Sequence, residues 1–185
     1  GETPIIGGSF SAEDDCSVTV TNTRRLADVK LSKLLDDRLK EEHETKEFEF
    51  KARLTEADGT AVSGFELADG ITTDTSGEAA FTMSPTNITA AERSFKAPVG
   101  AVMTITETSD PNYQITASAV TMPKEGVGEA IANEDTENDN IFTFHVTDDG
   151  AHVTFKNVRK MAEIELSKEL VNKVSKTESF TFTVT

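Results

Sequence analysis

Two passages of the sequence repeat each other, and each carries an asparagine and a lysine. The sequence around Asn22 and Lys33 returns without a gap around Asn157 and Lys168. Both pairs of equivalent residues lie 135 positions apart, as 157 − 22 and 168 − 33 give. A lysine amine attacks a carboxamide only in its neutral form, and burial in an apolar interior lowers the lysine pKa towards that form. These residues could therefore do amide chemistry in a fold that buries them.

A repeat of this period indicates tandem whole domains rather than solenoid repeats. The repeated passage then marks a junction, where one module ends near the asparagine and the next begins near the lysine. We predict that residues 1–24 are the C-terminal hairpin of a preceding module, that residues 25–160 form a complete module, and that residues 161–185 are the first strands of a following module. A module of about 130 residues is long enough to bury its own core.

Short runs of alternating apolar and polar residues recur along the middle module, and this period-two pattern is typical of half-buried strands. Only 6 % of the residues are aromatic, with no Trp, and Thr and Val are abundant, which suits a β-sandwich. We therefore predict an all-β fold, an Ig-like Greek-key β-sandwich. The runs include residues 48–54, 102–106, 113–120, 142–146 and 153–155.

Three segments of the middle module do not follow this pattern. Residues 35–46 are rich in charge and are predicted to form a short helix or an exposed loop between the first two strands. Residues 86–95 are predicted to hold one helical turn. Residues 123–140 contain two glycines and a cluster of acids, and we predict a surface insertion there.

The composition excludes several classes of partner. The formal net charge is −15, so nucleic-acid phosphates and anionic lipids would repel the chain. The single cysteine, Cys16, cannot form an internal disulfide. No apolar stretch approaches the length of a membrane span or a signal-peptide core, so we expect no membrane contact from this segment. In a secreted protein, the targeting and anchoring segments would lie outside this sequence.

The order of motifs in the middle module resembles the CnaB-type modules of Gram-positive surface adhesins and pilins. The motifs are a lysine-bearing opening strand, the Phe48-Glu-Phe run after it, the run from Pro98 to Glu107, and the closing Val153-Thr-Phe-Lys-Asn157. The resemblance spans essentially the whole middle module. It implies a spontaneous intramolecular isopeptide bond between a first-strand lysine and a last-strand asparagine, assisted by an acid on a central strand.

Carried onto this sequence, the resemblance makes Lys33 the nucleophile, Asn157 its partner and Glu107 the assisting acid. Burial raises a carboxyl pKa, so a neutral Glu107 could polarise the amide and pass protons to the departing ammonia. The folded scaffold would supply proximity, and no metal or cofactor is needed. Asn22 and Lys168 are the equivalent positions of neighbouring modules, and we expect neither to be bonded within this chain.

Strand parity supports the three assignments. Lys33, Glu107 and Asn157 each lie in phase with apolar residues of their own runs, which should point into the core. Taken singly, a lysine or a glutamate in a strand is more often solvated, and an asparagine after a strand is more often a turn residue. The apolar residues in phase with them are Val29, Leu31, Met103, Ile105, Val153 and Phe155.

We therefore predict a structural stalk or repeat module of a cell-wall-anchored surface adhesin or pilus-like protein, located outside a Gram-positive cell. Its partners would be neighbouring modules of the same chain. The crosslinking reaction would occur once in each chain, so the protein would not be an enzyme. We expect the two terminal segments to be loosely packed ends. The alternative, suggested by exposed strand edges, is strand exchange, in which the C-terminal segment of one molecule completes the N-terminal hairpin of another.

The alternative function is a ligand-binding adhesive module that recognises a host protein or glycan through surface loops. Residues 123–140 and the acidic residues 35–47 would form that surface, although aromatic residues for sugar stacking are nearly absent. Residues 135–140 lack the central glycine and terminal glutamate of a calcium loop, and we predict no metal site. The glycosylation sequon at Asn87 is interpreted as coincidental in a bacterial protein.

Overall fold

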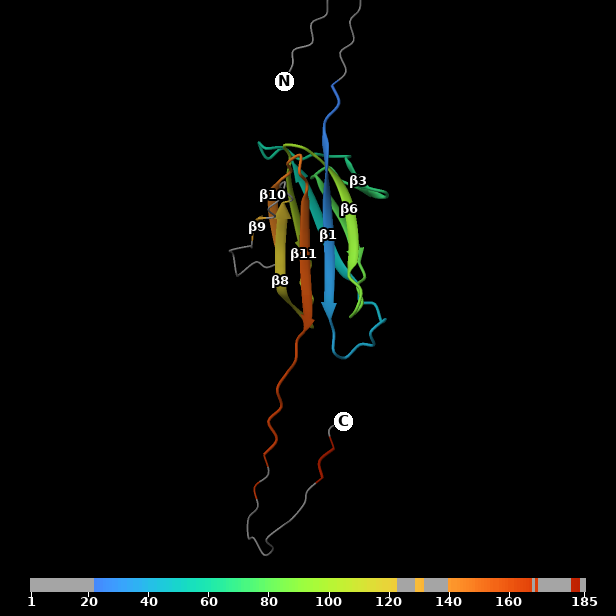
Figure 1. The fold of residues 1–185 in the computed structure, drawn as a ribbon, viewed down its shortest axis with the longest axis vertical. Helices are drawn as coiled ribbons and strands as arrows, with labels where there is room; N and C mark the ends of the chain where they lie inside the picture. The colour runs from blue at the N-terminus through green and yellow to red at the C-terminus, as the bar shows by residue number, and fades with distance from the viewer. Residues whose placement is uncertain (1–21, 123–128, 132–139, 168, 170–180, 184–185) are drawn as a thin grey trace, which may run out of the picture.

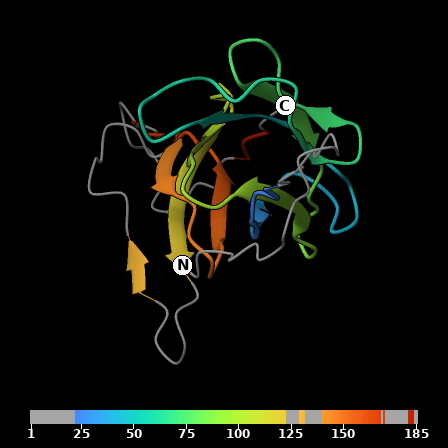
Figure 2. The ribbon, with the colours of Figure 1, turned by 90° about the horizontal axis from the view of Figure 1, so that it is seen from above.

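The computed structural model describes residues 22–122, 129–131, 140–167, 169 and 181–183. Within these residues the chain forms eleven strands and no helix, and the predicted all-β sandwich is confirmed. Figure 2 shows the two main sheets as facing layers. The strands are β1 (Leu26–Asp36), β2 (Phe48–Thr55), β3 (Glu66–Ala68), β4 (Ile71–Thr72), β5 (Glu78–Met83), β6 (Ala91–Pro98), β7 (Val102–Glu107), β8 (Tyr113–Met122), β9 (Glu129–Ile131), β10 (Ile141–His145) and β11 (Ala151–Arg159).

The first and last strands are parallel neighbours in the larger sheet. That sheet has the order β6-β1-β11-β8-β9, and the facing sheet has the order β10-β7-β2-β5. In the β1–β11 register Lys33 lies opposite Phe155, and Leu35 lies opposite Asn157. Side chains alternate between faces with a period of two, so Lys33 and Asn157 both point into the sandwich, two positions apart. β1 and β11 run side by side through the centre of Figure 1.

A close backbone approach brings the start of β11 against β1. Gly150 precedes β11 with φ +73°, a conformation that glycine adopts at little cost. A Cβ at this position would clash with the main-chain oxygen of Asp28 on β1. The missing side chain therefore allows the last strand to enter the sheet directly beside the first.

The interior between the sheets is apolar and rich in phenylalanine. The burial of β2 alternates residue by residue from Phe48 to Leu54, as the period-two pattern predicts. Rings from both sheets contact one another, with Phe50 and Phe155 5.5 Å apart between centroids and Phe142 and Phe155 5.2 Å apart. Such edge-to-face contacts are the favoured geometry of aromatic pairs. Any polar group in this interior is surrounded by hydrocarbon.

Two of the three irregular segments can be compared with the structure. The chain after β1 forms turns and loop up to residue 47, which is the loop alternative. The helical turn predicted within residues 86–95 is wrong, because β6 begins at Ala91 and pairs antiparallel with β1. Of the predicted insertion at residues 123–140, the structure describes β9 and Asn140, and the rest lies outside the described residues.

The described residues that flank the strands have no regular structure. Residues 22–25 and 161–167 are exposed, and Asn22 is among them. The hairpin predicted within residues 1–21 and the position of Lys168 lie outside the described residues, so the division into modules stays a prediction. In the part of the chain that is described, no helix could span a membrane.

Candidate functional site

Three strands bring the predicted lysine, glutamate and asparagine together in the core. We call Lys33, Glu107 and Asn157 the buried triad. They are 0 %, 1 % and 2 % exposed, respectively. Lys33 Nζ donates a hydrogen bond to Glu107 Oε2 at 2.6 Å. Asn157 Nδ2 donates to Glu107 Oε1 at 2.5 Å. One carboxyl group therefore bridges the amine and the carboxamide.

The strand register explains how these side chains meet. Lys33 and Asn157 come from adjacent strands of one sheet, whereas Glu107 ends β7 in the facing sheet and reaches across the interior. The backbone of Glu107 is fixed by Asn140, whose main-chain oxygen accepts from the Glu107 N–H at 2.8 Å. The Asn140 side chain also donates to the Glu107 main-chain oxygen at 3.1 Å.

Aromatic rings surround the lysine amine. Lys33 Nζ lies 4.4 Å from the ring centroid of Phe48. The centroids of Phe50 and Phe155 lie at 5.8 and 5.9 Å. A cationic amine is attracted by these ring faces, but the rings replace the water that a lysine normally keeps. The amine therefore has one strong polar partner, Glu107.

Burial moves the pKa values of both ionisable groups towards the neutral forms. Desolvation lowers the pKa of Lys33 to about 8, although the neighbouring Glu107 opposes that shift. Desolvation likewise raises the pKa of Glu107, against the effect of Lys33. The ion pair and the neutral pair differ only by the transfer of one proton across a 2.6 Å hydrogen bond. The site can therefore hold a neutral amine beside a neutral acid.

The carboxamide of Asn157 has an unsatisfied oxygen. Among the described residues, Oδ1 of Asn157 is the one buried side-chain polar atom without a hydrogen-bond partner. An unsatisfied buried acceptor is costly, at about 1–3 kcal/mol. Half a turn about the Cβ–Cγ bond would place Oδ1 beside Glu107, where a protonated carboxyl could donate to it. In that orientation a neutral acid would satisfy the acceptor and polarise the carbonyl group.

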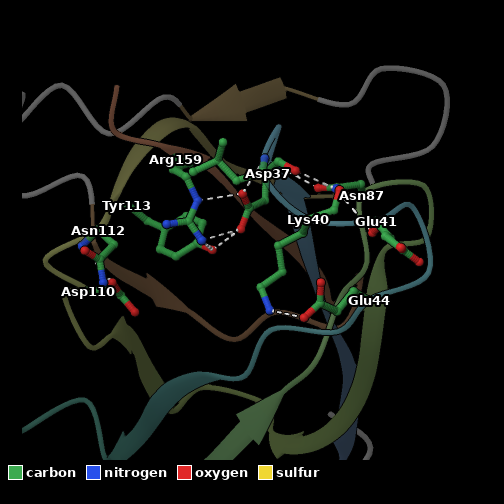
Figure 3. Close-up of polar contacts among 10 residues, drawn as sticks. Asp37, Lys40, Glu41, Glu44, Asn87, Asp110, Asn112, Tyr113 and Arg159 are labelled. Carbon is green, nitrogen blue, oxygen red and sulfur yellow. Dashed lines mark hydrogen bonds and ion pairs between the residues drawn. The ribbon is translucent and has the colours of Figure 1, made fainter. Parts of the chain in front are cut away.

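A second polar cluster, which the sequence reasoning missed, lies at the end of the same two strands (Figure 3). We call Asp37, Tyr113 and Arg159 the clasp. Arg159 Nε donates to Asp37 Oδ1 at 2.6 Å, and Arg159 Nη2 donates to Asp37 Oδ2 at 2.8 Å. Arg159 Nη2 also donates to the Tyr113 hydroxyl oxygen at 2.8 Å, and that hydroxyl donates to Asp37 Oδ2. The clasp joins β1, β8 and β11 without a covalent bond.

At neutral pH the clasp contains an anionic Asp37 and a neutral Tyr113. Hydrogen bonds from Arg159 are the main reason that the pKa of Asp37 falls to about 2. Burial, followed by the hydrogen bond to Asp37 and the charge of Asp37, raises the pKa of Tyr113 to about 12. One signal of the clasp was present in the sequence, because Asp37 keeps the phase of Lys33 and Leu35 one step beyond the strand.

The other predicted features have different outcomes. Asn22 is exposed, and Lys168 and most of the predicted ligand-binding insertion lie outside the described residues. The described residues contain no cluster of three or more potential metal ligands. The side chain of Asn87 is already engaged, because its amide exchanges hydrogen bonds with the backbone N–H and carbonyl oxygen of Asp37, each at 2.6 Å.

No protein-family model and no curated protein matches the sequence. Among solved structures, the chain is similar to the major pilin protein T3.2 of Streptococcus pyogenes, with 15 % identity and a TM-score of 0.46 over 72 % of this chain and 45 % of the pilin. It is similar to the pilus-presented adhesin Cpa, with 15 % identity and a TM-score of 0.48 over 71 % of this chain and 27 % of the adhesin. A further Streptococcus pyogenes major pilin is 19 % identical, with a TM-score of 0.40 over 71 % of this chain and 47 % of that protein. The chain spans less than half the length of each of these proteins.

Proposed function

We propose that this chain supplies a structural stalk module to an extracellular, cell-wall-anchored adhesin or pilus-like protein of a Gram-positive bacterium. We also propose that an isopeptide bond between Lys33 and Asn157 staples the module. The observation that carries this proposal is the Glu107 carboxyl group, which bridges the Lys33 amine and the Asn157 carboxamide in a dry interior. The resemblance of the motif order to CnaB-type modules supplies the biological setting.

The reaction is an aminolysis of the asparagine side chain. In the neutral pair, Lys33 Nζ attacks Asn157 Cγ while the protonated Glu107 donates a hydrogen bond to Oδ1 and stabilises the oxyanion. Glu107 then passes the proton lost by the amine to Nδ2. The Cγ–Nδ2 bond breaks, ammonia leaves, and the Nζ–Cγ amide remains. One C–N bond forms and one breaks, with no oxidant, metal or cofactor.

The folded scaffold supplies most of the rate. Aminolysis of an unactivated amide is slow between free molecules. Holding the reacting groups in place gives effective concentrations on the order of 10⁵–10⁸ M in well-oriented cases. In this module the parallel β1–β11 register and the reach of Glu107 from β7 provide that orientation. The reaction runs once in each chain and leaves the glutamate unchanged, so the product is a maturation crosslink.

The position of the bond explains its mechanical value. The chain enters the module at the start of β1 and leaves at the end of β11, at opposite ends of the module in Figure 1. Tension along the chain would therefore shear these two strands past each other. A bond between Lys33 and Asn157 carries the tension directly from the first strand to the last. The core and the other strands between them need not resist it.

The intact mass of the purified chain tests the proposal. We expect the wild type to be lighter than its sequence mass by one ammonia, and a proteolytic fragment to contain residues 33 and 157 on joined peptides. Glu107→Gln and Asn157→Ala should keep their full sequence masses. Glu49→Gln, an exposed position on β2, should lose ammonia as the wild type does. A wild-type mass equal to the sequence mass would overturn the crosslink.

A further inference from the structure

The end of β11, which carries Asn157, lies close to the point where its backbone pairing stops. The β8–β11 register shifts between Lys156 and Asn157, and the pairing with β1 ends at Val158. On the β8 side the bulge separates the last three residues of the strand from the longer ladder before it, whereas the pairing with β1 runs without a shift up to Val158. Such a bulge interrupts the hydrogen bonds and re-aims the side chains beside it. The carboxamide that must meet Lys33 therefore lies beside a bulge and one residue before the pairing with β1 ends.

The clasp contacts this strand end beyond Asn157. Arg159 follows Asn157 by two residues, and its guanidinium group grips both carboxylate oxygens of Asp37, four residues after Lys33. Tyr113 adds the first residue of β8 to the same cluster. The clasp therefore joins the same two strands as the proposed bond, four residues further along the chain from Lys33 and two residues beyond Asn157.

Asp37 is itself anchored on its other side. The Asn87 amide exchanges two hydrogen bonds with the Asp37 backbone and also donates to the Lys40 main-chain oxygen at 3.0 Å. The Leu39 N–H donates to Asp37 Oδ1 at 3.1 Å. Figure 3 shows Asn87 on one side of Asp37 and Arg159 with Tyr113 on the other. Arg159 thus binds to a residue that is itself held by hydrogen bonds to Asn87 and Leu39.

The clasp also contacts the lysine side of the triad. The Tyr113 ring meets Phe48 edge to face, with 5.4 Å between the centroids. Phe48 is the ring nearest to Lys33 Nζ, at 4.4 Å. One cluster therefore constrains the carboxamide through the backbone of β11 and the amine through Phe48.

We propose that Asp37, Tyr113 and Arg159 are positioning residues for the crosslinking reaction, because they hold the end of β11 in register until Lys33 is bonded to Asn157. This inference rests on the proposed function. A buried ion pair adds little net stability compared with apolar packing, but its directional hydrogen bonds specify one arrangement. Once the covalent bond has formed, it fixes Asn157 by itself. The clasp is therefore expected to control how fast the bond forms, more than whether it finally forms.

The test compares rates of ammonia loss in the full-length chain. The chain is assembled by chemical synthesis, kept unfolded and uncrosslinked in denaturant, and diluted into folding buffer. Folding is followed by circular dichroism, and crosslinking is followed by mass. We expect Arg159→Lys, which keeps the charge but loses the two-pronged grip, to slow crosslinking of folded protein by about tenfold, since small misplacements of reacting groups cost up to 10²-fold. Tyr113→Phe should give a smaller slowing.

The matched control is Arg24→Lys. Arg24 also grips a carboxylate with two nitrogens, both at 2.6 Å from Glu56, but it precedes β1 and is exposed. This variant should crosslink at the wild-type rate. Equal rates for wild type and Arg159→Lys, in chains that fold equally fast, would overturn the inference while leaving the proposed function intact. A wild type that folds and never loses ammonia would overturn the proposed function, and the inference with it.

Discussion

Two buried acids join the first and last strands of this module, and their pKa values shift in opposite directions. Glu107 meets Lys33 and Asn157 within the apolar core, and its pKa is raised. Asp37 meets Arg159 and Tyr113 at the strand ends, and its pKa is lowered to about 2. Glu107 is thus brought close to a neutral form that can transfer protons, whereas Asp37 stays an anion.

The difference comes from the cation that each acid faces. Lys33 is fully buried and can release its proton, so the triad can become a neutral pair. Arg159 remains charged at any ordinary pH, and its side chain keeps 22 % of its surface exposed to water. An acid beside such a cation gains two strong hydrogen bonds and no reactive neutral form. The partner, more than the depth of burial, separates the proposed reactive site from the clasp.

Replacing Lys33 should have the largest effect, because it removes the amine of the buried triad and leaves the clasp in place. We expect Lys33→Met, which replaces a buried amine with an apolar side chain of similar length, to abolish ammonia loss. The free energy of unfolding should fall by about 5 kcal/mol, since a crosslink that closes a loop of about 125 residues lowers the conformational entropy of the unfolded chain by about that much. Denaturant unfolding and tryptic half-life measure the change.

The control for this variant is Lys30→Met on the same strand. Lys30 lies in the outward phase of β1 and pairs at 2.7 Å with Glu92, whose side chain is 53 % exposed. Such pairs contribute about 0–1 kcal/mol, so this variant should stay close to wild type. If Lys33→Met resisted heat and trypsin as well as Lys30→Met does, the stapling role would be wrong.

The sequence predicted the triad better than it predicted the clasp. Strand parity placed Lys33, Glu107 and Asn157 towards the interior, because alternation is a local property of each strand. That the three would meet depended on a parallel pairing of two strands far apart in sequence. Only the resemblance to a known family supplied that pairing, since no local pattern encodes the register of distant strands.

The features that sequence reasoning missed depend on tertiary structure. Tyr113 and Arg159 stand at the first and last positions of their strands, where a polar side chain is usually solvated. Nothing local indicates that both turn towards Asp37. The helical turn expected within residues 86–95 failed for a similar reason, because pairing with β1 extends the chain from Ala91 onwards. Local propensity is a weak guide where an edge strand gains its hydrogen bonds from a neighbour.

Acid should weaken the clasp, because it protonates Asp37. The folded-state pKa of Asp37, about 2, lies below the ordinary value of 3.8. The stability that Asp37 contributes is therefore present above the ordinary value and is lost as pH falls from 3.8 towards 2. We expect a loss of about 2 kcal/mol, from a shift of somewhat less than two units.

This loss is best measured in the uncrosslinked Lys33→Met background, by denaturant unfolding at a series of acidic pH values. Asp37→Asn in the same background cannot titrate at that position. The difference in stability between the two proteins should therefore shrink as pH falls through this range. A difference that stays constant down to pH 2 would mean that Asp37 is not held as an anion by Arg159.

The pH dependence of crosslinking tests whether Lys33 and Glu107 act as one unit, and close to pH 8 it should be the smallest of these effects. The reactive neutral pair contains the same number of protons as the ion pair, so the rate should be level while the pair keeps its shared proton. Above pH 8, close to the lowered pKa of Lys33, that proton is lost and Glu107 has none to donate. The rate should then fall, by about tenfold for each further pH unit.

A lone amine would behave in the opposite way, because its neutral fraction grows with pH. Ammonia loss from the synthetic chain, diluted from denaturant into buffers on both sides of this pH, separates the two cases. A rate that keeps rising above pH 8 would leave Lys33 as an independent nucleophile and would remove Glu107 as the proton donor.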